Sequence, residues 1–209
     1  MERFEHAVES QSFHIEVEQS LINATVGRPV LLSVMPSVNV TSGTWKRNGE
    51  RLALWLGTTT DISLNYRERM EVLFPNASLL LKAVSFSDNG EYTVNMISFR
   101  GRAATARVDL RVFEPISSAY ITSNVSNPVR ENDSVCLTCI VVGNCTRRVW
   151  SFNGAVVESS ERIILSSGNV TLTIIGVHRR HSGEYQCRVS SPVSEAASEP
   201  YFLHIGSEY

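Results

Sequence analysis

The chain has 209 residues, of which 43% are hydrophobic, and its 19 Lys and Arg residues nearly balance 21 Asp and Glu residues. This composition excludes wholesale disorder and argues against nucleic-acid binding, which normally relies on a basic stripe. No run of 18 apolar residues is present, so no transmembrane helix is predicted. The length suits one large domain or two domains of about 100 residues each.

The two ends are predicted to lie outside any folded domain. Residues 1–6 carry acidic side chains and no apolar core, so they are not a secretory signal. We expect residues 1–12 to form a leader or a disordered segment, and residues 207–209 to form a short tail.

Short β-branched or alternating runs recur along the rest of the chain between turn residues. Examples are residues 30–34, 78–81 and 170–174. Because no convincing amphipathic helix interrupts them, the chain is predicted to be all-β and built as sandwiches.

The second half carries a set of residues with a recognised spacing. Cys139 is followed 11 residues later by Trp150, and later by Tyr185 and Cys187, which flank Gln186. This is the framework of an immunoglobulin-like sandwich, in which two strand residues meet across the sheets, a Trp packs on them and a Tyr closes the corner.

The first half repeats this plan without cysteines. Val34 precedes Trp45 by the same 11 residues, and Tyr92 lies two residues before Val94. We expect an apolar contact between the two valines to replace a disulfide, because burying each valine is worth roughly 1.5–3 kcal/mol and a disulfide about 2–4 kcal/mol.

A disulfide between Cys139 and Cys187 is therefore expected in the second half only. Such a bond requires an oxidising compartment, so we expect the protein to work outside the cytosol, either at the cell surface or in secreted form. An anchor would have to lie outside this sequence.

Loop length distinguishes the two sandwiches. Trp45 and Tyr92 are 47 residues apart, whereas Trp150 and Tyr185 are only 35 apart. The extra residues suit an added C′–C″ hairpin, so residues 13–114 are predicted to form a variable-type domain and residues 115–206 a C2- or I-type domain.

Asn-X-Ser/Thr sequences predict surface sites for N-linked glycans. The seven asparagines are Asn23, Asn39, Asn76, Asn124, Asn132, Asn144 and Asn169.

The remaining cysteines, Cys136 and Cys145, have no evident role. A bridge between them would need a bent strand, so three arrangements stay open: that bridge, intermolecular pairing and free thiols. The four cysteines lack two paired C-x-x-C knuckles, so no metal site is expected.

The E–F corner, which precedes Tyr92 in the first domain and Tyr185 in the second, is predicted to differ between the two domains. Arg69 and Asp88 are placed for the ion pair that is usual in variable-type domains. In the second domain Arg162 has the matching position, but His181 stands in place of the Asp. We expect His181 to be an ordinary exposed polar residue.

Residues 75–81, 121–129, 137–139, 162–165 and 168–173 resemble the carcinoembryonic-antigen-related cell adhesion molecules. The resemblance covers residues 13–206, although Cys136, Cys145 and His181 depart from the family pattern. It implies binding of a protein partner, either another copy or a different protein, through the outer face of the GFCC′C″ sheet of the first domain.

That face can be assigned from the sequence. Asn48-Gly49 is expected to form a two-residue hairpin turn, so Trp45 should pair with Leu52. The residues then expected on the outer face are Thr44, Lys46, Arg51, Ala53, Trp55, Thr93, Asn95, Ile97 and Arg107.

Trp55 is the expected hot spot of this face, because an outward Trp beside Ile97 with basic neighbours is typical of interfaces. The alternative is that Trp55 is buried under residues 61–66. Phe99 and Arg100, at the tip of the F–G hairpin, form either a second recognition element or an ordinary hairpin.

These features predict an adhesion or immune-recognition ectodomain. A CD2- or signalling-lymphocyte-type receptor and a soluble secreted decoy or ligand are the alternatives. No catalytic set, phosphate loop or metal cluster is evident, so we expect neither an enzyme nor a cofactor.

Overall fold

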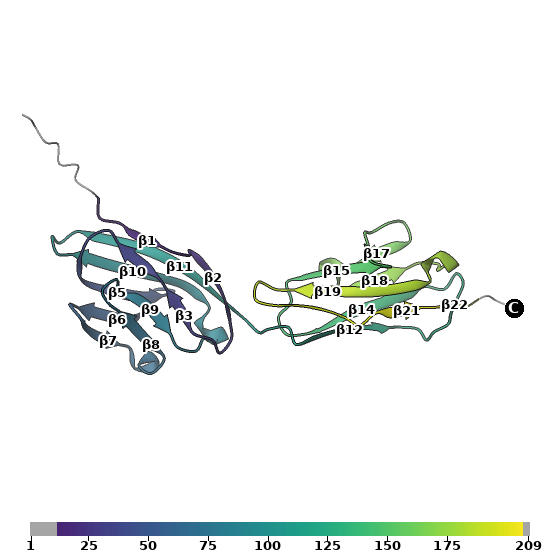
Figure 1. The fold of residues 1–209 in the computed structure, drawn as a ribbon, viewed down its shortest axis with the longest axis horizontal. Helices are drawn as coiled ribbons and strands as arrows, with labels where there is room; N and C mark the ends of the chain where they lie inside the picture. The colour runs from purple at the N-terminus through teal and green to yellow at the C-terminus, as the bar shows by residue number, and fades with distance from the viewer. Residues whose placement is uncertain (1–11, 207–209) are drawn as a thin grey trace, which may run out of the picture. The chain divides into compact units, whose positions relative to one another are not determined.

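The structure, a computed structural model, describes residues 12–206 and consists of two compact units that divide between Val112 and Phe113 (Figure 1). We call them domain one and domain two. The expected boundary, between residues 114 and 115, lies two residues further on. The predicted leader, apart from Ser12, and the predicted tail fall outside the described residues.

Both domains are immunoglobulin-like β-sandwiches, so the prediction of an all-β chain is confirmed. The helical turns among the described residues are short 3-10 segments, and none of the helices there could cross a bilayer.

Domain one packs a six-stranded sheet on a smaller one. The large sheet has the order β2-β11-β10-β5-β6-β7, in which the last five strands are G, F, C, C′ and C″. Opposite it lie a three-stranded sheet, β3-β9-β8, and a β1-β4 pair. The strands are β1 (Ile15–Val17), β2 (Leu21–Thr25), β3 (Val30–Leu32), β4 (Val34–Pro36), β5 (Val40–Arg47), β6 (Glu50–Leu56), β7 (Thr59–Ile62), β8 (Met70–Leu73), β9 (Ser78–Leu81), β10 (Gly90–Ser98) and β11 (Ala103–Phe113).

Domain two has the shorter plan expected of a C2- or I-type domain. One sheet has the order β12-β14-β18-β17, and the other has the order β16-β15-β19-β20 with β21 also paired to β19. The strands are β12 (Ser118–Ser123), β13 (Val129–Arg130), β14 (Val135–Val142), β15 (Arg147–Phe152), β16 (Ala155–Val156), β17 (Ile163–Leu165), β18 (Thr171–Ile174), β19 (Gly183–Ser190), β20 (Glu195–Ala197), β21 (Tyr201–Leu203) and β22 (Ile205–Gly206).

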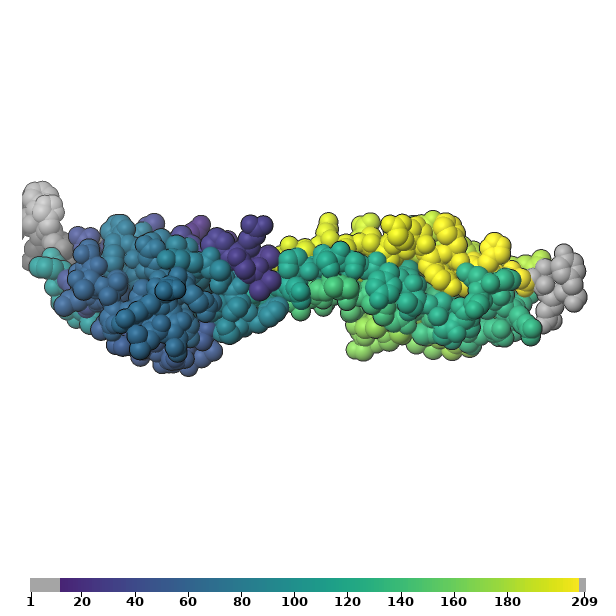
Figure 2. Space-filling model, turned by 90° about the horizontal axis from the view of Figure 1, so that it is seen from below, coloured from purple at the N-terminus to yellow at the C-terminus, as the bar shows by residue number. Residues whose placement is uncertain are grey.

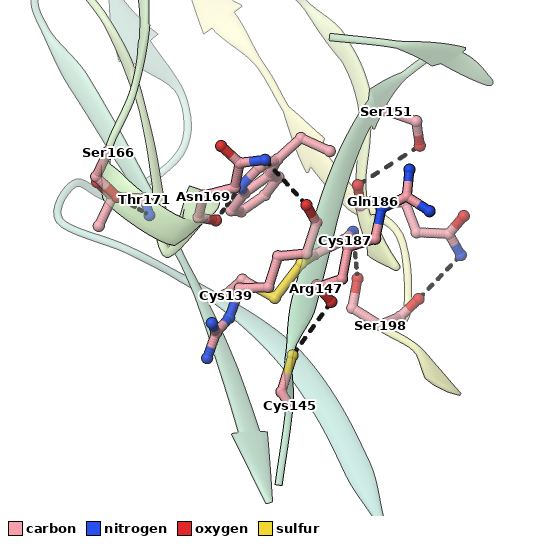
Figure 3. Close-up of a disulfide and its surroundings, with 12 residues drawn as sticks. Cys139, Cys145, Arg147, Ser151, Ser166, Asn169, Thr171, Gln186, Cys187 and Ser198 are labelled. Atoms are coloured by element: carbon pink, nitrogen blue, oxygen red, sulfur yellow. Dashed lines mark hydrogen bonds between the residues drawn. A yellow bond between two sulfur atoms is a disulfide. The ribbon is translucent and has the colours of Figure 1, made fainter. Parts of the chain in front are cut away.

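The two cores are built at matching positions with different chemistry. In domain one, Val34 and Val94 are buried in the same apolar cluster as Trp45. In domain two, Cys139 and Cys187 form the expected disulfide (Figure 3) and are buried in the same cluster as Trp150. The disulfide joins residues 48 positions apart, a long loop whose closure restricts the unfolded chain.

Trp45 and Trp150, which occupy matching positions in the two cores, are each fixed by one hydrogen bond. Trp45 Nε1 donates to the carbonyl of Ala77 at 2.9 Å, and Trp150 Nε1 donates to the carbonyl of Asn169 at 2.8 Å. Both acceptor residues have positive φ, 60° and 54°, in the turn that leads into β9 or β18. A left-handed residue at this turn therefore aims a carbonyl at the buried indole in both domains.

The corner of domain one is closed by the buried carboxylate of Asp88, in the 3-10 segment η2 (Phe86–Asp88). It accepts the N–H of Ser85 at 2.8 Å and forms ion pairs with Arg69 and Arg47. The hydroxyl of Tyr92 donates to the Asp88 carbonyl at 2.8 Å. The expected Arg69–Asp88 pair is thus part of a larger charged corner.

The corner of domain two uses a histidine in the same place, in η4 (Arg179–His181). The expectation that His181 is exposed is wrong, because the residue is buried. Its Nδ1 accepts the N–H of His178 at 3.0 Å, so the ring must be neutral at that nitrogen. Arg162, lacking a carboxylate partner there, donates to the Gly176 carbonyl at 3.1 Å.

Acid should therefore weaken domain two. Burial lowers the pKa of His181, and the charges of Arg180, His178 and Arg162 lower it further. The unfolded chain then takes up the proton at a higher pH than the folded domain does. The free energy of unfolding should consequently fall as the pH drops below about 6.5. Scanning calorimetry of the chain across this range measures the effect.

His181→Asp is the matched control. An aspartate can accept the same N–H and pair with Arg162, as Asp88 does with Arg69 in domain one. The variant should lose most of the acid sensitivity between about pH 7 and about pH 5.5. An equal loss of stability in both proteins would show that His181 is not the group responsible.

Candidate functional site

The candidate site is the outer face of the six-stranded sheet of domain one. The hairpin between β5 and β6 turns at Asn48-Gly49, as predicted, with positive φ at both residues. Neighbouring strands bring Asn95 beside Thr44, and Ile97 beside Ser42. Strands β10, β5 and β6 therefore present a continuous surface.

A β-bulge changes the expected pairing of β5 with β6. Lys46 pairs with Arg51 as predicted, but the register shifts there and Trp45 pairs with Ala53 rather than with Leu52. Leu52 is the extra residue, and both Leu52 and Ala53 are fully buried. A bulge of one residue reverses the side on which every following side chain lies.

The prediction that Trp55 is an exposed hot spot is consequently wrong, and so is the outward assignment of Ala53. Trp55 is only 1% exposed and belongs to the core of domain one. Its ring lies against Gly43, the residue that pairs with it on β5. A side chain at Gly43 would overlap two ring carbons of Trp55 and the carbonyl of Asn95. The glycine thus makes room for the indole.

The same bulge turns two leucines outward. Leu54 is 40% exposed and Leu56 is 73% exposed. Leu56 pairs with Ser42, whose other neighbour is Ile97, so these apolar side chains flank one small residue. The sequence analysis missed both leucines. Gly43 was the available signal, because a glycine inside a strand often marks a bulge or a close approach.

The F strand lies as expected. Ile97 is 44% exposed, and Thr93 and Asn95 alternate with buried residues of β10. Thr105 on β11 donates its hydroxyl to the Asn95 side-chain oxygen at 2.6 Å. This bond fixes the polar neighbour of the apolar cluster.

Charged side chains, which we call the charged border, lie on the same sheet as the apolar cluster formed by Leu54, Leu56 and Ile97. Arg51 lies 3.3 Å from Asp61 on β7, and Arg107 lies 3.3 Å from Glu91 on β10. Both pairs are solvent-exposed, so each contributes little to stability and remains available to a partner.

Phe99 and Arg100 occupy the turn between β10 and β11, as expected. Phe99 is 84% exposed, more than any residue of the apolar cluster. Its exposure extends the apolar surface toward the F–G tip.

The two extra cysteines do not form a bridge with each other, which was one of the three arrangements expected for them. Cys136 and Cys145 are separate, half-buried free thiols in the structure. The Sγ of Cys145 donates to the carbonyl of Arg147 at 3.2 Å (Figure 3). Cys136 lies on β14, opposite Thr173 of β18.

The predicted glycan sites differ in how free their side chains are. Asn169 stands out because its Nδ2, the atom that would carry the sugar, donates to the Arg148 carbonyl at 2.9 Å (Figure 3). Asn39 and Asn76 line one groove of about 540 Å³ in domain one. Asn23, Asn124, Asn132 and Asn144 are exposed. Occupancy of all seven remains a prediction.

The outer face of the sheet carries no cluster of metal-binding side chains among the described residues. No group of three His, Cys, Asp or Glu residues among residues 12–206 could hold a metal ion. The site presents exposed apolar side chains with a charged border, which suits contact with a macromolecule.

Comparison with known proteins places the chain in a family. A model described as an immunoglobulin domain matches residues 119–191. Over 138 residues, 66% of the chain, the sequence is 34% identical to pregnancy-specific glycoprotein 22 and 32% identical to the cell adhesion molecule CEACAM5, both from Mus musculus. The crystal structure of murine CEACAM1b superimposes with a TM-score of 0.77 and 29% identity, over 93% of this chain and 100% of that one. The chain is a CEACAM-like member of the immunoglobulin superfamily.

The CEACAM-like chain matches only part of its curated relatives, and it also resembles other solved structures. It spans 29% and 14% of the lengths of the two curated relatives. A crystal structure of a mouse coronavirus receptor-binding domain with its murine receptor matches with a TM-score of 0.70 and 26% identity, over 91% of this chain and 99% of the matched one. The CD2-binding domain of CD58, at 16% identity and a TM-score of 0.65, shares the fold.

Gly43→Ala should destabilise domain one of the CEACAM-like chain. The added methyl group cannot coexist with the Trp55 ring, so we expect a loss of about 1–3 kcal/mol, as in other overpacked cores. Urea unfolding followed by tryptophan fluorescence measures it. Ser42→Ala, one residue earlier and on the outer side of β5, is the control and should be near neutral. Equal stability of the two variants would show that Trp55 does not occupy this space.

Proposed function

We propose that the chain is a recognition module of a cell-surface or secreted adhesion protein, and that it binds a protein partner through the outer GFCC′C″ face of domain one. The name of one relative, cell adhesion molecule CEACAM5, agrees with this role. The Cys139–Cys187 disulfide supports a location outside the cytosol.

The apolar cluster carries the proposal. Leu54 and Leu56 on β6 and Ile97 on β10 are exposed on the two strands that flank β5 in one sheet, where no core requires them. Exposed apolar side chains with a polar border are typical of protein interfaces. Placement on strands also holds the surface in one shape, which lowers the entropic cost of binding.

The charged border favours orientation rather than affinity. Lys46, Arg51 and Arg107 alternate with Glu91 and Asp61, so the border carries both signs. A surface with both signs can face a second copy of itself without net repulsion, and it can also match a different protein of mixed charge. We therefore propose a protein partner that is either another copy or a second protein.

Replacing Leu56 or Ile97 by Glu should weaken binding about tenfold or more, because a charge would be placed in the dehydrated centre of the contact. Beads coated with the chain can be tested for aggregation with one another and for capture by a panel of cells. Bead aggregation reports binding between copies, and capture reports binding of a different protein.

Leu31→Glu is the matched control for this prediction. Leu31 is 45% exposed, like Ile97, but it lies on β3 in the opposite sheet. Its replacement should leave binding unchanged. If Leu56→Glu and Ile97→Glu bind as well as Leu31→Glu does, the GFCC′C″ face is not the binding surface.

A further inference from the structure

The outer face of the four-stranded sheet of domain two has an unusual composition. The side chains that alternate with the core residues of β12, β14, β18 and β17 include no Lys, Arg, Asp or Glu. They are Tyr120 together with serine, threonine, valine, isoleucine and one cysteine. Because about a quarter to a third of a typical soluble surface is charged, a sheet face without charge is unusual for a surface left open to solvent.

The other sheet of domain two shows that the absence of charge is specific to this side. Its strands β15, β19 and β20 expose Arg147, Arg188 and Glu195. Tyr120 is 48% exposed and Ile164 is 47% exposed on the uncharged face. β12 forms one edge of this face, and Figure 2 shows teal-green residues from this part of the chain at the surface of domain two.

A glycan site lies in line with this face. Asn124 directly follows β12, and its N–H donates to the Cys136 carbonyl at 3.2 Å. Its side-chain oxygen in turn accepts the Cys136 N–H at 2.7 Å. Across the sheet, Cys136 pairs with Thr173, and Thr173 pairs with Ile164. Asn124 therefore begins a row that crosses the whole uncharged face.

The hydrogen bond at Asn124 also fixes the direction of an attached sugar. With Oδ1 held by Cys136, rotation of the carboxamide is restricted, and Nδ2 has no protein partner among the described residues. Asn169 differs, because its Nδ2 donates to a carbonyl. A linkage whose first bond is fixed loses less conformational entropy when the sugar settles on the protein.

We propose that an N-linked glycan on Asn124 lies on the uncharged outer face of domain two and shields Cys136. The linkage forms when Nδ2 attacks the anomeric carbon of a polyprenyl-diphosphate oligosaccharide. The new N–C bond replaces the C–O bond to the diphosphate leaving group, and Nδ2 loses one of its two protons. The face suits a sugar: Thr122, Thr138 and Thr173 offer hydroxyls, whereas Tyr120 and Ile164 offer apolar surface.

The free thiol makes the proposal measurable. The chain is secreted from mammalian cells as wild type and as Ser126→Ala, which removes the sequon while Asn124 keeps its bond to Cys136. Glycopeptide mass spectrometry determines occupancy of Asn124. The rate at which N-ethylmaleimide alkylates Cys136 is then compared, with Cys145 in the same chain as the reference thiol.

We expect Asn124 to be occupied, and we expect Cys136 to react about fivefold faster in Ser126→Ala than in the wild type, since thiol reactivity follows access. Cys145 should react equally in both. Ser134→Ala, which removes the exposed Asn132 sequon, should leave the rate at Cys136 unchanged.

Two results would overturn the proposal: an unoccupied Asn124, or equal alkylation of Cys136 with and without its glycan. Sedimentation of the same proteins identifies the competing occupant. Self-association of the occupied wild type that is lost in Ile164→Asp would show that a second copy covers this face. A wild type that stays monomeric while Ser126→Ala associates would support the glycan as the cover.

Discussion

The close contact between the ring of Trp55 and the backbone of Gly43 determines the surface of domain one. β6 has one extra residue relative to β5 before Trp55 is reached, so the indole pairs with Gly43 and fills the space that a side chain there would occupy. The bulge at Leu52 absorbs that residue, so Trp55 enters the core while Leu54 and Leu56 point to solvent. A packing requirement in the interior thus selects which apolar side chains a partner can meet.

The two domains solve the same structural problems with different residues. Both bury a tryptophan whose indole N–H is held by the carbonyl of a left-handed residue. Both close a corner with a tyrosine hydroxyl that donates to a backbone carbonyl. The shared parts are those that backbone geometry demands. Two parts differ. A pair of valines in domain one stands where domain two has a disulfide, which responds to reducing agents. The carboxylate of Asp88 stands where domain two has the imidazole of His181, which responds to pH near neutrality.

Much of the fold could be predicted because its determinants are local or repeated. The spacing from Val34 to Trp45 reappears between Cys139 and Trp150, and Asn-Gly specifies its turn by backbone geometry alone. The site was predicted less well because strand alternation has a period of two, so one bulge reverses every assignment beyond it. Thr44, Lys46 and Arg51 precede or adjoin the bulge and were placed correctly, whereas Trp55 follows it and was not. The burial of His181 depends on contacts with segments distant in sequence, which no local pattern reveals.

The absence of a disulfide in domain one has a consequence for where recognition can occur. Its core depends on Val34, Val94 and their apolar neighbours, and none of these groups exchanges electrons with thiols. A reducing medium would open Cys139–Cys187 and loosen domain two, yet it would leave the sheet that carries Leu56 and Ile97 chemically unchanged. The surface proposed for binding is thereby insulated from the redox state of its surroundings, and domain two alone responds to that state through its disulfide.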